Sequence, residues 1–277
     1  MKLIVILLCV LFLAGCTDQL RVEPENSLTF GNITKEKDVE ALVYGVGAGV
    51  RDMVCWNALL QVEKGAYADE ADESRRGARM LELEAGTADL WEAWYQVIMG
   101  AETVLSHVDV VEMPNERRQF YRGQAYFFKA LAYFDLIRRW GDCILQKGGI
   151  NWEPVAKTPW PKVCDFAIEM AEKAAEILPP FDKLTDCNGN TMFSKSTPCQ
   201  GAAYALLAHL CAWKAGGKYF AAEVDRNYDE KELWDMAEKA CTKVIESPLY
   251  DLVATPEEVC ASVLVGNSKE GVYETLL

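Results

Sequence analysis

The sequence predicts an almost entirely α-helical protein of 277 residues. From residue 34 onward, apolar side chains recur three or four residues apart in six segments, which places them on one face of a helix. The only hints of strand are a hairpin signal at Asn188-Gly189 and residues 271–277. Alternating large and small residues on the helix faces favour antiparallel pairs with tetratricopeptide-like packing and long irregular loops, although the strict motif of that repeat is not matched in order.

The N-terminal segment predicts export and a lipid anchor. Residues 3–13 form an apolar run that is too short to cross a hydrocarbon layer of about 30 Å as a helix. The following Leu-Ala-Gly-Cys, residues 13–16, resembles the bacterial lipobox, in which the signal is cut before a cysteine that is then acylated. The alternative is an ordinary signal peptide that happens to contain a cysteine. We therefore expect a signal peptide over residues 1–15, a lipidated Cys16 and a polar tether over residues 16–33.

Three helices are expected in the first half of a domain that spans residues 34–277. The first begins with Thr34 as its N-cap, and the second follows Thr87. The third, over about residues 115–140, is apolar on more than one side, so we expect it to be buried between neighbours. Four tryptophans fall on helix stripes that are predicted to be buried, and are expected in the core: Trp91, Trp94, Trp140 and Trp213.

Three more helices follow. The fourth is expected to end at Pro179-Pro180, and the fifth, over about residues 198–215, is rich in alanines that allow close approach between helices. The sixth begins with Asp229 as N-cap in a capping-box pattern. The Pro-rich connection before the fourth helix contains Trp152 and Trp160, which are the better candidates for exposed aromatic residues.

Composition excludes several classes of protein. With 28 Lys+Arg against 42 Asp+Glu the net charge is −14, which argues against a nucleic-acid-binding protein. Half of the residues are hydrophobic and a quarter are charged, which is typical of a folded chain. There are only two histidines, and no two cysteines have the C-x-x-C spacing of zinc and redox sites. We therefore assign no catalytic residue, no metal site and no cofactor.

The cysteines allow two interpretations. Because an exported chain can form disulfides, Cys187 and Cys199, which flank one loop, are the best candidate pair. The alternative, which we favour, is that most cysteines are small apolar residues in helix interfaces. Cys211 and Cys241 lie on apolar helix faces, as this alternative expects.

A charged loop over residues 65–79 is the candidate ligand site. Sugar recognition combines a flat aromatic face with polar groups that bond hydroxyls in pairs. Tyr67 offers the aromatic face, and Asp69 and Arg75 offer the polar contacts. The alternative is a solvated charged loop, which is the more frequent meaning of such a pattern.

Three segments in order carry a more specific pattern. The chain has an acidic residue, a leucine and a proline after Cys16, within residues 16–24. Residues 123–136, GQAYFFKALAYFDL, lead to Gly141-Asp142, and alanine-rich segments further on close with IESPLYDL at residues 245–252. Together these segments resemble the SusD/RagB family of outer-membrane nutrient-binding lipoproteins from Bacteroidetes, over essentially the whole mature chain.

The resemblance implies a binding protein rather than an enzyme. Such a protein is lipid-anchored on the cell outer membrane, sits over a TonB-dependent transporter and helps to capture an oligosaccharide or another nutrient. Its tetratricopeptide-like helices face the transporter. Family members continue into a long C-terminal half, so we expect this chain to be an N-terminal portion, either a fragment or a truncated gene product.

Two other functions stay open at this point. A helical-repeat module that binds a protein partner and no small ligand would fit the same helices. A glycoside hydrolase would need two carboxylates about 5 to 9.5 Å apart across a cleft, and no motif identifies such a pair among the 42 acidic residues.

Overall fold

The computed structural model describes residues 31–67, 89–149 and 153–275, with the side chains of residues 54–67, 89 and 90 outside the description. Nearly all described residues belong to one compact unit, Thr34–Leu277. Within the described ranges this unit is helical and forms no β-strand, so the strand expected near its end is absent through residue 275. No helix in these ranges is long and apolar enough to cross a membrane.

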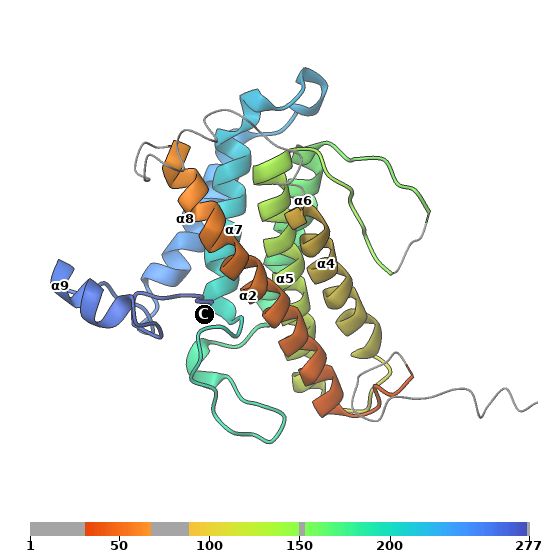
Figure 1. Ribbon diagram of the computed structural model, residues 1–277, viewed down its shortest axis with the longest axis vertical. Coiled ribbons are helices and arrows are strands. Elements are labelled where there is room, and N and C mark those ends of the chain that lie inside the picture. Colours follow the sequence, from red (N-terminus) through yellow and green to blue (C-terminus); the bar gives the residue numbers. More distant parts are fainter. Residues whose placement is uncertain (1–30, 68–88, 150–152, 276–277) are drawn as a thin grey trace, which may run out of the picture. The chain divides into compact units, whose positions relative to one another are not determined.

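The helices follow one another along the described part of the chain and pack as neighbours (Figure 1). The long helices are α2 (Glu36–Tyr67), α4 (Asp89–His107), α5 (Asn115–Trp140), α6 (Trp160–Ile177), α7 (Gln200–Gly216) and α8 (Glu230–Ile245). The short ones are α9 (Pro256–Glu258), η3 (Phe181–Lys183), η4 (Lys218–Phe220), η5 (Glu223–Asp225) and the single π-helical turn η6 (Val259–Val263). Each long helix contacts the next, which confirms the predicted stacking of helix pairs.

Helix α5 is the centre of the unit, as its apolar faces predict. It contacts α2, α4, α6 and α7, and more than half of its 26 residues are buried. Close approach of α6 requires Gly123, because a Cβ there would lie 2.8 Å from the side chain of Leu178. At its N-terminal end Arg117 donates to Glu36 at 2.7 Å and to Glu40 at 3.2 Å, which ties α5 to α2.

The helix ends show which predicted caps form. Thr34 is not the N-cap of α2, because the helix begins at Glu36 and Lys35 is the residue before it. Asp38 in the first turn accepts from the backbone N–H groups of Thr34 and Lys35 at 3.1 and 2.9 Å. The predicted cap of α8 is confirmed, since Asp229 accepts from the N–H of Lys231 at 2.8 Å. Thr87 lies outside the described residues.

The predicted hairpin at Asn188-Gly189 forms a tight turn between isolated bridge partners, Thr185 and Thr191. Gly189 has φ +82°, a left-handed conformation that favours glycine. The N–H of Asp186 donates to the carbonyl of Asn190 across the turn at 2.9 Å. The two sides do not extend into strands.

Two of the tryptophan predictions are wrong. Trp94 is buried as expected and Trp91 and Trp140 are half-buried, but Trp213 is 43% exposed because Lys214 and Ala215 occupy the buried face at that end of α7. Trp160 is buried rather than exposed. It begins α6 and packs beneath Gly217, where a Cβ would lie 3.1 Å from its ring. Trp152 lies outside the described residues.

The described cysteines are free thiols, so Cys187 and Cys199 are not joined. Burial confirms the favoured interpretation for Cys143, Cys164, Cys199 and Cys211, and desolvation raises the pKa of Cys143 and of Cys211 to about 12. The expectation for Cys241 is wrong, because this side chain is exposed. The reason is that α8 buries only a narrow stripe, formed by Leu233, Ala237 and Ala240.

Candidate functional site

The predicted ligand residues fall at the end of α2 and beyond it. Tyr67 is the last residue of this helix, so the irregular segment begins later than residue 65, where we expected it. The side chain of Tyr67, together with Asp69, Arg75 and the lipidation residue Cys16, lies outside the described residues. These four assignments stay predictions.

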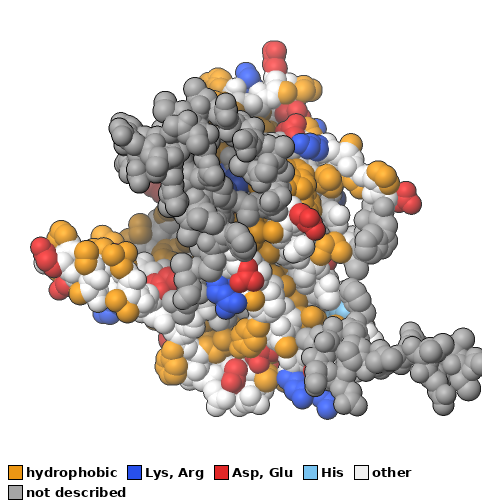
Figure 2. Space-filling model, viewed as in Figure 1, with side chains coloured by type: hydrophobic (Ala, Val, Ile, Leu, Met, Phe, Trp, Pro, Cys, Tyr) orange, Lys and Arg blue, Asp and Glu red, His pale blue; other side chains and the backbone are white. Residues whose placement is uncertain are grey.

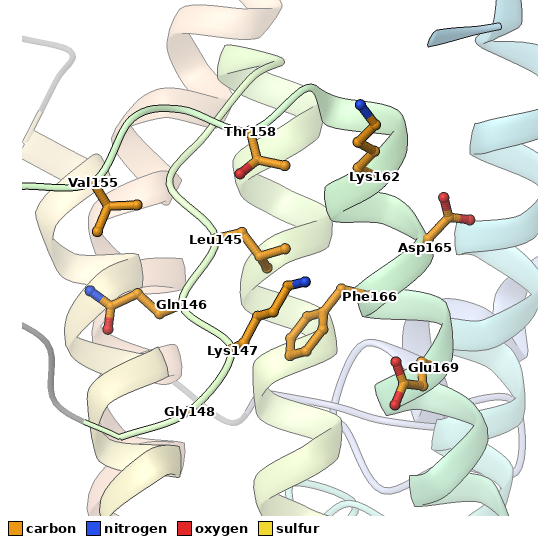
Figure 3. A pocket seen from close by; sticks show the side chains of 10 residues that line it. All are labelled: Leu145, Gln146, Lys147, Gly148, Val155, Thr158, Lys162, Asp165, Phe166 and Glu169. Atoms are coloured by element: carbon orange, nitrogen blue, oxygen red, sulfur yellow. The ribbon is translucent and has the colours of Figure 1, made fainter.

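A pocket of about 580 Å³ lies between α6 and the connection that follows α5 (Figure 3). This volume falls within the range of roughly 300 to 1,000 Å³ that is usual for small-ligand sites. The connection and α6 line it with Leu145, Gln146, Lys147, Gly148, Val155, Thr158, Lys162, Asp165, Phe166 and Glu169.

Two tyrosine hydroxyls hold the pocket wall formed by the connection, at residues 144–146, in an extended conformation. Tyr95 on α4 donates to the carbonyl of Ile144 and accepts from its N–H, both at 2.8 Å. Tyr133 on α5 does the same to Gln146, at 3.2 and 2.8 Å. Because alternate residues of an extended segment direct their backbone groups to the same side, two hydroxyls replace a neighbouring strand. Burial raises the pKa of both tyrosines above its usual value, so both hydroxyls remain protonated donors at neutral pH.

The connection is also held at its base and at Gly149. At its base the backbones of Cys143 and Thr158 exchange hydrogen bonds at 3.2 and 2.7 Å. Further along, the N–H of Gly149 donates to Glu102 at 3.2 Å. Glu102 forms a buried ion pair with Lys129, whose ammonium also lies 5.1 Å from the ring centroid of Phe166. One buried pair therefore supports both the connection and an aromatic residue of the pocket.

Most charges that line the pocket have partners. Lys162 pairs with Asp225 at 3.1 Å, Asp165 pairs with Lys214, and Glu169 pairs with Lys173 at 2.6 Å. The exception is Lys147, which is exposed and forms no ion pair with any described residue. Figure 3 shows its side chain extending toward Phe166 of α6.

A second lining residue has an unmet hydrogen-bonding group. The side-chain oxygen of Gln146 is buried and has no hydrogen-bond partner within the described part of the chain. Buried polar atoms of this kind are rare in folded proteins. In Figure 3 this side chain points to the side of the connection opposite Lys147, as expected for successive residues of an extended segment.

Taken together, the pocket offers hydrogen-bonding groups of both kinds beside one aromatic ring. In the described ranges no cluster of three or more His, Cys, Asp or Glu residues could hold a metal ion. The sequence did not indicate this site. In the sequence, Tyr95 and Tyr133 belong to the apolar faces of helices. The spacing of residues does not indicate that their hydroxyls bond to backbone groups elsewhere in the chain.

Comparisons with known proteins agree on one family. The SusD-like family model described as "Starch-binding associating with outer membrane" matches residues 61–211, more than half of the chain. SusD-like protein P2 of Formosa agariphila is 25% identical over 220 residues, which cover 74% of this chain and 41% of that protein.

Solved structures match the fold. A SusD-like carbohydrate-binding protein from Bacteroides vulgatus aligns with a TM-score of 0.64 and 18% identity, over 87% of this chain and 50% of that one. A structure solved with a xylogluco-oligosaccharide aligns with a TM-score of 0.55 and 19% identity, over 70% of this chain and 36% of that one. The chain thus spans half or less of the length of these relatives.

Proposed function

The chain belongs to the SusD-like family of starch-binding proteins that associate with the outer membrane, and from this premise we propose that it is a surface lipoprotein that binds an oligosaccharide nutrient. The observation that carries the proposal is the family match over residues 61–211, which includes α4, α5, α6 and most of α7. Two structural relatives, one a carbohydrate-binding protein and one solved with a xylogluco-oligosaccharide, favour a glycan as the ligand.

The finer parts of the proposal concern delivery and anchoring. Acylation at Cys16 would hold the protein on the outer membrane, and the bound glycan would pass to a TonB-dependent transporter. The end of α2 with Tyr67, and the segment after it with Asp69 and Arg75, would contribute a stacking face and hydrogen bonds to the sugar. The protein would act without catalysis, so the glycan would reach the transporter intact.

Glycan binding is tested directly with the full chain. Isothermal titration and affinity electrophoresis would compare a malto-oligosaccharide, a xylogluco-oligosaccharide and an oligogalacturonate. We expect saturable binding of at least one of them, with no new reducing ends after prolonged incubation. A chain that binds none of these glycans contradicts the proposal, and release of reducing ends shows a hydrolase instead.

Anchoring and delivery need separate measurements in the native cell. Labelled palmitate should be incorporated into the wild-type chain and lost from Cys16→Ser, whereas Cys260→Ser, which changes an exposed thiol, should keep the label. Affinity purification from detergent-solubilised outer membranes should recover a TonB-dependent barrel with the wild-type chain. Label that persists in Cys16→Ser rejects the anchor, and recovery without a barrel rejects the delivery step.

A further inference from the structure

We propose that the pocket between α6 and residues 145–148 is a subsite for a neutral sugar unit, in which Gln146 and Lys147 bond hydroxyls and Phe166 forms an apolar wall. The proposal rests on the proposed glycan-binding function. It adds a second site to the one predicted at Tyr67, Asp69 and Arg75, and it states that the ligand is uncharged.

Lys147 is the first group that points to a ligand. Its ammonium is a strong hydrogen-bond donor, and no described carboxylate is paired with it. The residues on both sides of it are held in place, because Tyr133 bonds both backbone groups of Gln146 and Glu102 accepts from Gly149. The donor therefore stands on a fixed backbone, which reduces the entropy lost when a ligand binds.

The second feature that points to a ligand is the backbone edge of residues 145–148 that faces away from Tyr95 and Tyr133. The backbone groups of Ile144 and Gln146 face the two tyrosine hydroxyls, so those of Leu145 and Lys147 point the other way. Among the described residues, no hydrogen bond uses the backbone N–H or C=O of Leu145 or Lys147. A sugar hydroxyl both donates and accepts, so an edge with alternating donors and acceptors matches it.

Gln146 is the third and independent observation. An amide oxygen that is buried without a partner costs stability, and it gains a hydrogen bond when a donor reaches it. A hydroxyl of a ligand lying along the open edge becomes that donor after a small shift of the side chain. Gln146 would then flank the ligand on one side of the segment, with Lys147 and Phe166 on the other (Figure 3).

The charges around the pocket favour a neutral ligand. The side chains of the lining have no net formal charge, with Lys147 and Lys162 against Asp165 and Glu169, although both carboxylates are already paired with lysines outside the lining, and the whole chain carries −14. A uronate or sulfate would meet these carboxylates, whereas a neutral sugar needs no counter-charge. The ring of Phe166 is positioned for stacking because it packs edge-on against Tyr133, with centroids 5.6 Å apart.

The decisive experiment compares Lys147→Met with a matched control, Lys183→Met, in the full chain. Methionine keeps most of the apolar stem but removes the ammonium. Lys183 is an exposed lysine on η3, 71% accessible at its side chain and outside the pocket lining. Titration with the malto- and xylogluco-oligosaccharides should show affinity lowered about ten-fold or more in Lys147→Met and unchanged in Lys183→Met. Affinity of the wild type should vary little with salt.

A second variant, Gln146→Leu, separates binding from folding. Leucine removes the unpaired oxygen, so the melting temperature should stay the same or rise. Affinity for the neutral oligosaccharide should fall by about two- to ten-fold, the range for one neutral hydrogen bond. A variant that is destabilised, or that binds as tightly as the wild type, overturns the role given to Gln146.

The remaining outcomes tell the two proposals apart. If the wild type binds a neutral oligosaccharide and Lys147→Met binds it equally well, this subsite is wrong while the glycan-binding function stands. If the wild type binds only the oligogalacturonate, with affinity that falls steeply with salt, the neutral class is wrong. If the wild type binds none of the probes, the proposed function fails and this inference fails with it.

Discussion

Helices α5 and α8 differ in how they are buried, although both belong to the same unit. Helix α5 contacts four other long helices and buries residues on several sides, including the polar Lys129 and Asp135. Helix α8 packs on α7 and buries only three residues along one stripe. Trp234 and Ile245 on α8 are 49% and 78% exposed. Figure 2 shows more exposed apolar side chains on the segment that contains α9 and η6. Leu264 and Val265, which follow η6, are each 75% exposed.

Buried polar groups, as well as apolar ones, distinguish the centre of the unit at α5 from its edge at α8. In α5, Asp135 accepts from the indole N–H of Trp94 at 2.7 Å and pairs with Arg138 at 2.9 Å. Lys129 is paired with Glu102. Such groups are costly to bury alone, so each ties α5 to a neighbour or to its own next turn. In α8 the charges are solvated and the helix depends on its cap and its stripe.

Lys129→Met in α5 should lower the free energy of unfolding much more than the substitutions in α8 described below. The substitution leaves the Glu102 carboxylate buried without its cation, and breaking a buried pair in this way costs about 3–5 kcal/mol of unfolding free energy. Urea unfolding followed by circular dichroism measures it. Lys173→Met, which breaks the exposed pair with Glu169 on α6, is the control and should cost less than about 1 kcal/mol.

The double variant Lys129→Met with Glu102→Gln tests the cause of that loss. Removing both charges should restore most of the stability, because the penalty arises from the lone buried carboxylate. The glutamine can still accept from Gly149. If the double variant is as unstable as Lys129→Met, packing of the lysine stem rather than its charge stabilises the centre.

The next effect concerns the tyrosine that holds the pocket wall. Tyr133→Phe removes the hydroxyl that bonds Gln146 twice, and we expect a loss of about 1–3 kcal/mol. Burial raises the pKa of Tyr133, so the folded state retains this proton more tightly than the unfolded state. The stability from this shift is present below the ordinary tyrosine pKa of about 10 and is lost as the pH rises above it.

Unfolding titrations from pH 8 upward measure this loss. The wild type should lose stability above pH about 10, and Tyr133→Phe should lose less over the same range. Tyr126→Phe on the same helix is a suitable control, since no pocket-wall hydrogen bond involves it. An alkaline decline that is identical in the wild type and Tyr133→Phe would show that this tyrosine does not contribute to it.

The same contrast explains how much the sequence predicted. The bounds of α5, the end of α6 before Pro179 and the cap of α8 at Asp229 follow from local spacing, and all were confirmed. The predicted burial of Trp213 and Cys241 was wrong, because burial depends on which face of the helix a neighbouring helix covers. The pocket was missed because its wall depends on contacts between residues nearly 50 positions apart, such as Tyr95 with Ile144.

A smaller effect is expected at the start of α8. Asp229→Ala removes the side chain that accepts from the N–H of Lys231, and loss of such a cap costs about 1 kcal/mol. Hydrogen exchange should show faster opening of the first turn of α8 than in the wild type, with exchange in α5 unchanged. Asp229→Asn should recover most of the loss, because asparagine is an equally good N-cap. Equal protection in the alanine variant would mean that packing on α7 alone holds this end.

The smallest effect is expected at the far end of the same helix, where Ile245 is 78% exposed. Ile245→Ser removes an apolar side chain that is largely in contact with solvent, so unfolding free energy should change by no more than about 0.5 kcal/mol. Leu136→Ser in α5, where the leucine is fully buried, should by contrast destabilise the fold severely, because it leaves a cavity and buries a hydroxyl. Thermal unfolding of both variants measures the contrast. If Ile245→Ser lowers the melting temperature as much as Leu136→Ser does, then another surface covers the end of α8 in solution. In that case α8 is not an exposed edge, and the distinction between centre and edge fails at this helix.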